Sequence, residues 1–334
     1  MIKDKIKVGN FELKNRMVKA PIHSETCILG KVTKDTVRHY EERTKGGRFG
    51  LVVVEHSFVR YDGMASPTQM SAWHDSDIEG LKRLADLIHR NGSTAILQLS
   101  HAGCGAQRVW TGVQPISASN LSIVCGWPNG KVNPETPKPM TKEDILDLEE
   151  CFFRAAARAM KAGFDGVNIH SAHGYLLDQF YSPITNKRTD EYNGQTLEGR
   201  IRLHQEIIYG IRQIIGNNAL LTLRLGGCDY IAGGTSIEDT VEASRAFEKM
   251  GVDLIDISGG LCCFVRPGHK EPGYFGDISE AVKKAVSIPV LLTGGVNTVG
   301  DADQLLLENK ADMIGVGRAI TKDAGWGAEL AQRM

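Results

Sequence analysis

Short apolar runs recur along the chain, and an amphipathic stretch with helical spacing follows most of them. Most of the runs are continuous instead of alternating, as expected for parallel strands that are covered on both faces. We expect strands at 17–21, 51–55, 94–99, 166–170, 220–225, 254–258, 290–293 and 313–316. Eight strand–helix units in a chain of 334 residues predict an α/β fold closed into a (β/α)8 TIM barrel.

Helix start signals lie between the expected strands. Thr141, Thr196 and Ser236 each stand directly before an amphipathic stretch, where N-cap residues are preferred. After the first strand, by contrast, the chain has no G-x-G-x-x-G turn, which an open doubly wound sheet usually carries there. The barrel is therefore favoured over the open sheet.

Two segments lie outside the repeat of strand and helix. Residues 1–16 alternate in polarity around Gly9 and Asn10, a two-residue turn signal that predicts an N-terminal β-hairpin. Residues 101–140, after the third strand, are rich in Gly, Pro, Ser and Trp and are too long for a simple loop, so we expect a cap over the barrel mouth. No linker or repeat divides the chain, and residues 1–334 are predicted to form one domain.

The charge balance excludes several kinds of partner. The chain has 39 basic and 40 acidic residues, a net charge of -1, which offers no general attraction to nucleic acid or to an anionic membrane. No apolar run approaches the roughly 20 residues needed to span a bilayer. The first residues contain no apolar stretch typical of a secretory signal. We therefore expect a cytoplasmic protein.

The seven cysteines are odd in number and scattered, with no C-x-x-C pair. This pattern argues against a disulfide scaffold and against a zinc or iron–sulfur site. Reduced thiols are expected, and the adjacent Cys262 and Cys263 are interpreted as incidental loop residues.

Active-site residues of TIM barrels lie at the carboxyl ends of the strands. The seventh strand ends in Gly294 and Gly295, and the eighth ends in Gly317 followed by Arg318. Glycine N–H groups and an arginine at this place predict a phosphate-binding site. The alternative is that these glycines only let the strands turn into helices.

The third and fifth strands place an amide and a guanidinium, Gln98 and Arg224, in the barrel mouth. Both groups suit a flat heteroaromatic ring that carries carbonyls and ring nitrogens. An arginine in this position can stabilise negative charge on the N1–C2 edge of a reduced flavin. A bound phosphate can belong to a substrate or to a cofactor, and these two side chains bear on that choice because they suit a ring such as that of a flavin.

The fourth strand ends in His170 and His173, followed by Tyr175. The histidines can be metal ligands, structural side chains beneath the cap, or donors of hydrogen bonds to a substrate oxygen. In the last case Tyr175, with an ordinary pKa of about 10, is a candidate proton donor. Asp178 and Arg188, further on, are interpreted as structural.

Lys19 on the first strand raises a different hypothesis. A buried lysine at the barrel mouth can form a Schiff base with a carbonyl substrate, which would make the protein a lyase. Schiff-base lysines of barrels come more often from later strands.

Five segments together resemble the Old Yellow Enzyme family of FMN-dependent ene-reductases, and the similarity extends over nearly the whole chain. They are 15–21 (NRMVKAP), 98–103 (QLSHAG), 170–175 (HSAHGY), 182–194 (SPITNKRTDEYNG) and 315–318 (GVGR). Because the chain ends at Met334, it resembles the short, single-domain bacterial members.

The resemblance implies a barrel that binds FMN non-covalently and takes a hydride from NAD(P)H in a ping-pong cycle. His170 and His173 would bind the carbonyl or nitro oxygen of an activated alkene, and Tyr175 would protonate its Cα. The residues implied to contact the flavin ring are Ala20, Pro21, Gln98 and Arg224. The residues implied to hold the phosphate are Gly294, Gly295, Gly317 and Arg318.

The chain departs from the family pattern at three positions. His23 stands where relatives commonly have Cys or Thr beside the flavin, and His56 where they have a small residue; both are expected to contact the cofactor. Glu25 replaces a substrate-contacting tyrosine and is expected at the substrate. The expected partner is a small enone-type substrate, and the sequence is compatible with a homo-oligomer. A quinone reductase, an NAD(P)H oxidase and a flavin-binding sensor without turnover are the alternatives.

Overall fold

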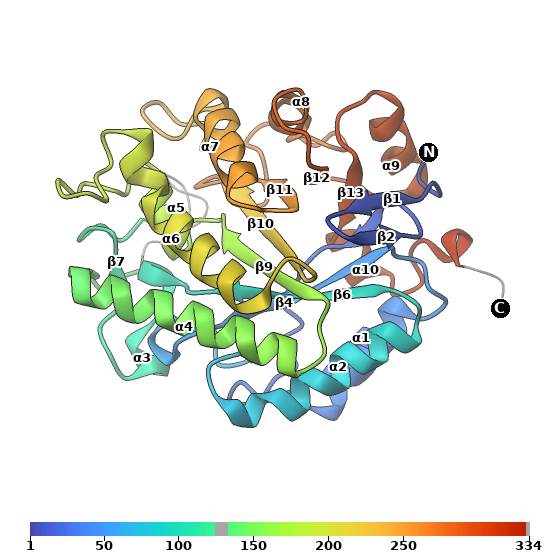
Figure 1. Ribbon diagram of the computed structural model, residues 1–334, viewed down its shortest axis with the longest axis horizontal. Coiled ribbons are helices and arrows are strands. Elements are labelled where there is room, and N and C mark those ends of the chain that lie inside the picture. The colour runs from blue at the N-terminus through green and yellow to red at the C-terminus, as the bar shows by residue number, and fades with distance from the viewer. Residues whose placement is uncertain (124–132, 332–334) are drawn as a thin grey trace.

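Eight parallel strands close into a barrel in the computed structural model, which describes residues 1–123 and 133–331 (Figure 1). The barrel strands are β3 (Met17–Lys19), β4 (Leu51–Phe58), β6 (Thr94–Ser100), β9 (Gly166–Ser171), β10 (Leu220–Gly226), β11 (Leu254–Ser258), β12 (Val290–Thr293) and β13 (Met313–Val316). Their order is β3-β13-β12-β11-β10-β9-β6-β4, and the pairing of β3 with β4 closes the ring. The predicted TIM barrel is confirmed, with all eight strands in the expected places.

An outer ring of helices covers the strands (Figure 1). The longer helices are α1 (Lys34–Thr44), α2 (Ile78–Arg90), α4 (Lys142–Lys161), α6 (Leu197–Ile215), α7 (Ile237–Lys249), α8 (Gly276–Lys283) and α9 (Val299–Leu307). The shorter ones are α3 (Arg108–Thr111), α5 (Leu176–Tyr181) and α10 (Arg318–Lys322). Thr141, Thr196 and Ser236 cap α4, α6 and α7 as predicted, each accepting a backbone N–H with its side chain.

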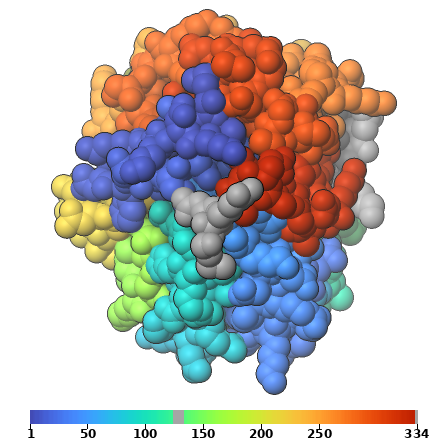
Figure 2. Space-filling model, turned by 90° about the vertical axis from the view of Figure 1, so that its right-hand side faces the viewer, coloured from blue at the N-terminus to red at the C-terminus, as the bar shows by residue number. Residues whose placement is uncertain are grey.

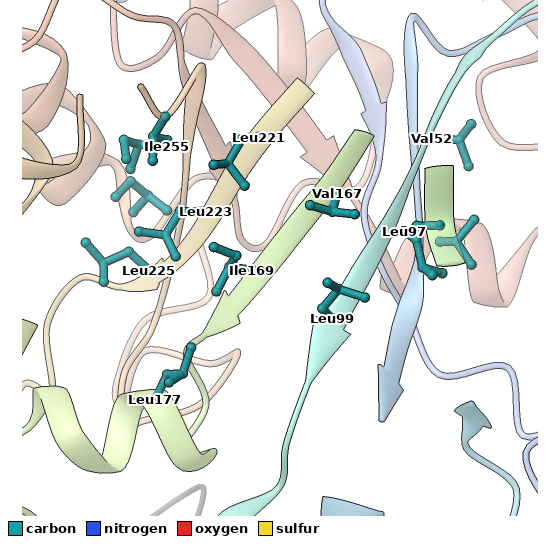
Figure 3. Close-up of a cluster of buried hydrophobic side chains, with 14 of the residues drawn as sticks. Val52, Leu97, Leu99, Val167, Ile169, Leu177, Leu221, Leu223, Leu225 and Ile255 are labelled. Carbon is teal, nitrogen blue, oxygen red and sulfur yellow. The ribbon is translucent and has the colours of Figure 1, made fainter. Parts of the chain in front are cut away.

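The main hydrophobic core lies between the strands and the helices. Figure 3 shows the outward-facing side chains of β6, β9 and β10, such as Leu97, Ile169 and Leu223, gathered in this layer with Leu177 of α5. Each of these side chains is at most 1% exposed. Burial on this face explains why the strands are continuous apolar runs, since their alternate residues fill the barrel interior.

A second cluster fills the bottom of the barrel. The predicted hairpin is present as β1 (Ile6–Val8) paired with β2 (Phe11–Leu13). Its Val8 and Leu13 pack against the first inward-facing residues of the strands, including Leu51 and Leu220. The hairpin therefore closes the amino-terminal end of the barrel and leaves the opposite end open for chemistry.

The N-terminus is fixed beside a late element of the chain. Figure 2 shows the blue N-terminal segment next to the red C-terminal segments on one face of the molecule. The backbone N–H of Ile2 donates to Asp303 of α9 at 2.8 Å, which anchors the start of the chain. No helix in the described ranges is both long and apolar enough to cross a bilayer.

The excursion after β6 is present, as predicted. Its described parts contain α3 and two short strands, β7 (Ile116–Ser117) and β8 (Lys138–Pro139), which pair in parallel. They pack against α5, where Ser117 donates to the amide oxygen of Gln179 at 2.8 Å. Residues 124–132 of the predicted cap lie outside the described residues. The covering of the mouth by this segment, and the single-domain organisation, stay predictions.

Candidate active site

A cavity of about 470 Å³ opens at the carboxyl ends of the strands. Every residue predicted for the site lines it. From the first strands these are Ala20, Pro21, His23, Glu25, His56 and Gln98, and from the later ones His170, His173, Tyr175, Arg224, Gly294, Gly295, Gly317 and Arg318. The structure thus brings the predicted residues together, while the role of each stays a prediction.

The floor of the cavity is a hydrogen-bonded polar layer. Gln98 donates to Asn168 at 2.8 Å, and Asn168 donates to Thr222 at 2.7 Å, across three neighbouring strands. Next to them, Arg224 donates to Asp256 at 2.7 Å, and both side chains are nearly fully buried. Asp256 was not predicted, although a buried arginine requires such a partner. These contacts fix the amide of Gln98 and the guanidinium of Arg224 beneath the cavity.

Three side chains from one segment form a wall of the cavity. The His170 ring lies 5.2 Å from the His173 ring and 5.3 Å from the Tyr175 ring, between centroids. Burial lowers the pKa of His173 to about 3 and that of His170 well below its usual value, and the neighbouring imidazoles and Arg224 add to both shifts. Both rings are therefore neutral N–H donors at physiological pH. Burial also raises the pKa of Tyr175 to about 12, so its hydroxyl keeps its proton.

His170 has a hydrogen-bonding atom that the described protein leaves unused. Its Nδ1 is buried and has no partner among the described residues. The Nε2 atom of His173, by contrast, lies 2.8 Å from the hydroxyl of Ser258. An unpaired buried polar atom is costly, so the ring of His170, which lines the cavity, is a candidate for contact with a bound group.

The turn that carries these side chains is strained and clamped. His173 has a φ of 63°, a left-handed conformation that costs about 1–3 kcal/mol for a residue with a side chain. Two side chains of α5 hold the backbone of the next residue, Gly174. Asp178 accepts from the Gly174 N–H at 2.7 Å, and Gln179 donates to the Gly174 carbonyl oxygen at 2.6 Å. Asp178 has the structural contact that was predicted for it.

The opposite end of the cavity is suited to a phosphate. The backbones of Gly294, Gly295 and Gly317 line it together with the exposed Arg318. Arg318 donates to the Tyr274 hydroxyl at 2.6 Å, and among the described residues no carboxylate forms an ion pair with it. A positive charge without a carboxylate partner is available for an anionic ligand. This end, the polar floor and the unpaired His170 atom together form a cavity that fits FMN.

A bulge in β4 brings His56 into the site. The pairing of β4 with β6 shifts its register between Val54 and Ser57. After this irregularity His56 is the only residue of β4 that is not fully buried, and it lines the cavity. His23 lies next to it, with 5.4 Å between the ring centroids. Bulges commonly redirect side chains at barrel rims.

The sequence prediction missed two aromatic residues of the cavity. Phe264 and Tyr274 come from the long loop between β11 and α8 and line the cavity beside Arg318. Phe264 also lies 6.1 Å from His173, between ring centroids. The length of this loop, which exceeds that of a usual strand–helix connection, is the sequence feature that could have indicated these two residues.

Lys19 does not belong to the cavity. Its ammonium group lies 4.6 Å from the centre of the Tyr40 ring, a residue of α1, on the outer side of the strand. Burial lowers its pKa to about 8. The lysine does not line the cavity. The structure therefore speaks against the Schiff-base hypothesis.

The cysteines correct one expectation. Cys27, Cys104, Cys151, Cys228 and Cys262 are free, as expected. Cys263 is disulfide-bonded and lines the cavity, so its interpretation as an incidental reduced loop residue was wrong. The described part of the chain contains no group of three or more His, Cys, Asp or Glu side chains that could hold a metal ion.

The sequence matches the NADH:flavin oxidoreductase / NADH oxidase family over residues 4–334. The chain belongs to this family. Its similarity to the NADPH dehydrogenase of Halalkalibacterium halodurans is 36% identity over 326 residues, covering 97% of this chain and 92% of the relative. FMN is therefore its cofactor and NAD(P)H its reductant.

Solved structures place this flavin oxidoreductase among the Old Yellow Enzymes. The Old Yellow Enzyme homologue of Zymomonas mobilis has a TM-score of 0.83 and 26% identity, covering 97% of this chain and 90% of that one. A complex of 2-naphthoyl-CoA reductase with 2-naphthoyl-CoA has a TM-score of 0.89 and 29% identity. The match covers 97% of the flavin oxidoreductase but only 51% of the longer 2-naphthoyl-CoA reductase.

Proposed function

We propose that this flavin oxidoreductase reduces the activated C=C bond of α,β-unsaturated carbonyl compounds, with NAD(P)H and the alkene using the same cavity in turn. The observation that carries the proposal is the convergence of His170, His173 and Tyr175 on one wall of the cavity, with ring centroids 5.2 and 5.3 Å apart. FMN, when bound, supplies to the alkene the hydride that NAD(P)H has given it.

The two histidines bind the carbonyl oxygen of the alkene. Their lowered pKa values keep them neutral, so they act as hydrogen-bond donors that strengthen as negative charge develops on that oxygen. The clamp on Gly174 holds His173 in its strained conformation before the substrate arrives, so orientation costs little during the reaction.

Tyr175 donates a proton to Cα of the alkene. Its pKa of about 12 keeps the hydroxyl protonated at neutral pH, and a carbon that has gained electron density is basic enough to take the proton. The tyrosinate that remains lies beside the neutral His170 ring, 5.3 Å away between centroids. Proton return from solvent then resets the site.

The remaining lining explains how the cofactor would be held. Gln98 and Arg224 would contact the ring from the polar floor, and Arg318 with the glycines after β12 and β13 would hold the phosphate. Ala20, Pro21 and His23 of the first strand–helix loop would complete the ring site. Glu25, exposed at the mouth, is proposed to meet the outer part of the substrate.

The test is the oxidative half-reaction of the FMN-loaded enzyme. The enzyme is reduced with NADPH without oxygen, because the similar H. halodurans relative is called NADPH dehydrogenase. It is then mixed with cyclohexenone, a nitroalkene, a quinone or dioxygen, and flavin absorbance is followed. Rapid reoxidation with saturated product from the enone supports the proposal. Reoxidation by quinone or dioxygen alone would replace it with an oxidase-type function, and no turnover with any acceptor would favour a sensor.

A further inference from the structure

His56 has no part in the mechanism above, yet it lies beside the residues that perform it. Its ring centroid is 5.6 Å from that of Tyr175 and 6.3 Å from that of His170. It keeps exposed surface while every other residue of β4 is buried, and it lines the cavity. The bulge in β4 therefore delivers a third imidazole to the wall where the alkene would bind.

The buried Gln69 determines which nitrogen of His56 carries the proton. The backbone N–H of Ala65 donates to the Gln69 Oε1 atom at 2.7 Å, which fixes the orientation of the amide. The Gln69 Nε2 atom then lies 2.9 Å from His56 Nδ1 and 3.2 Å from the His56 carbonyl oxygen. An amide nitrogen only donates, so His56 Nδ1 accepts and the ring proton is on Nε2.

The Nε2–H group of His56 lacks a protein partner. Among the residues that the structure describes, the hydrogen bonds of His56 involve its Nδ1 and its carbonyl oxygen and not Nε2. Burial lowers the pKa of the ring to about 3, with a further contribution from His23, so the group is a neutral donor. A neutral donor with its tautomer fixed and no acceptor of its own is ready to bind an oxygen that a ligand brings.

We propose that His56, held by Gln69, is a second oxygen-binding site, which makes the enzyme prefer alkenes with two oxygen functions, such as cyclic ene-diones, over simple enones. This inference rests on the proposed function, in which His170 and His173 bind the first oxygen. A monocarbonyl substrate offers the His56 N–H no second acceptor. A site built to donate a hydrogen bond discriminates against an analogue that lacks the acceptor.

A binding cycle on the FMN-loaded enzyme tests this directly. Dissociation constants of para-hydroxybenzaldehyde and para-cresol, two phenols of similar size that differ in a carbonyl oxygen, are measured by calorimetry. His56→Leu should weaken binding of the aldehyde about 3- to 10-fold more than binding of the cresol. This factor corresponds to the net contribution of one neutral hydrogen bond. His56→Gln, whose amide N–H reaches the Nε2 position, should restore most of this difference.

A matched control lies on the same loop as Gln69. Thr68 contacts His23 and not His56, with 3.3 Å between its hydroxyl and His23 Nε2, so Thr68→Val should leave the ratio of the two dissociation constants as it is. An equal loss of affinity for both phenols in His56→Leu would overturn the proposal and leave His56 as a cofactor contact.

Kinetics separate this inference from the proposed function. The ratio of kcat/KM for ketoisophorone, a cyclic ene-dione, to that for the matching trimethylcyclohexenone should fall by about 3- to 10-fold in His56→Leu. If the enzyme reduces neither compound, the proposed function fails, and the binding cycle still decides the role of His56.

The tautomer of His56 is tested separately. Nitrogen NMR of labelled histidine, assigned with His56→Leu, should show Nε2 protonated; a proton on Nδ1 would refute the tautomer.

Discussion

Tyr175 is the residue whose role can be isolated most cleanly. In the proposed function its hydroxyl is needed only when Cα of the alkene takes a proton, and hydride transfer from NAD(P)H does not use it. Tyr175→Phe should therefore slow alkene reduction by about 10²- to 10⁴-fold, the usual contribution of a positioned acid. Reduction of the flavin by NADPH should keep its rate. Stopped-flow measurement of the two half-reactions checks this.

A similar loss in both half-reactions of Tyr175→Phe would contradict the role of the hydroxyl as proton donor. It would show that the hydroxyl shapes the cavity as a whole. The two lowered histidine pKa values make this separation practicable, because His170 and His173 stay neutral over the pH range in which the enzyme is handled. The pH dependence of alkene reduction near neutrality then does not come from these two rings.

At the level of single residues, the sequence predicted which side chains meet but not how they are held. The strand ends placed His170, Tyr175 and Arg224 at one mouth, because a closed parallel barrel has only one such end. The partners that fix them come from other parts of the chain. Asp256 lies under Arg224, and Gln69 fixes the tautomer of His56. Such pairs depend on the folded register, which no local pattern contains.

Among the elements, β9 and α6 are joined by a buried histidine away from the cavity. His204 of α6 lies 2.6 Å from the hydroxyl of Ser171, the residue that follows His170. Its ring stacks on Phe247, with 5.7 Å between centroids. Burial lowers its pKa to about 3. The folded protein therefore holds His204 neutral where the unfolded chain, with a pKa of about 6.5, would take up a proton.

This difference predicts a pH-dependent stability. A depressed pKa contributes stability that is present above about pH 6.5 and is lost as the pH falls towards the folded value. Relative to His204→Gln, the parent should lose about 1.4 kcal/mol of unfolding free energy for each pH unit below about 6.5. Urea denaturation of both proteins between neutral and mildly acidic pH measures it. A difference that stays constant with pH would contradict the burial of a neutral ring.

Strand positions were predictable, whereas their irregularities were not. The apolar runs predicted the start of each barrel strand because burial on the helix-covered face requires them. The prediction ended the second strand at residue 55, but β4 continues to Phe58 through a bulge. The polar residues Glu55, His56 and Ser57 interrupt the apolar pattern there. The same bulge turns His56 into the cavity, so the residue to which we assign specificity lies where the strand departs from regular geometry.

On the scale of the whole molecule, the two ends of the barrel have separate tasks. The bottom cluster, built from the hairpin and the first inward residues of the strands, shares no residue with the cavity lining. Between them lies the hydrogen-bonded layer of Gln98, Asn168 and Arg224. Because that layer is fixed by its own contacts, a change at the bottom should affect the stability of the barrel without altering the mouth.

Leu13→Ala tests this separation. Leu13 of the hairpin is 1% exposed and packs in the bottom cluster, so its truncation should lower the free energy of unfolding by about 2–5 kcal/mol. Leu146→Ala on α4, where the side chain is 62% exposed, serves as the control and should change stability little. The affinity of the folded Leu13→Ala enzyme for para-hydroxybenzaldehyde should equal that of the parent. A loss of affinity as well as stability would show that the bottom of the barrel positions the histidine pair, because packing would then transmit strain through the polar layer to the cavity.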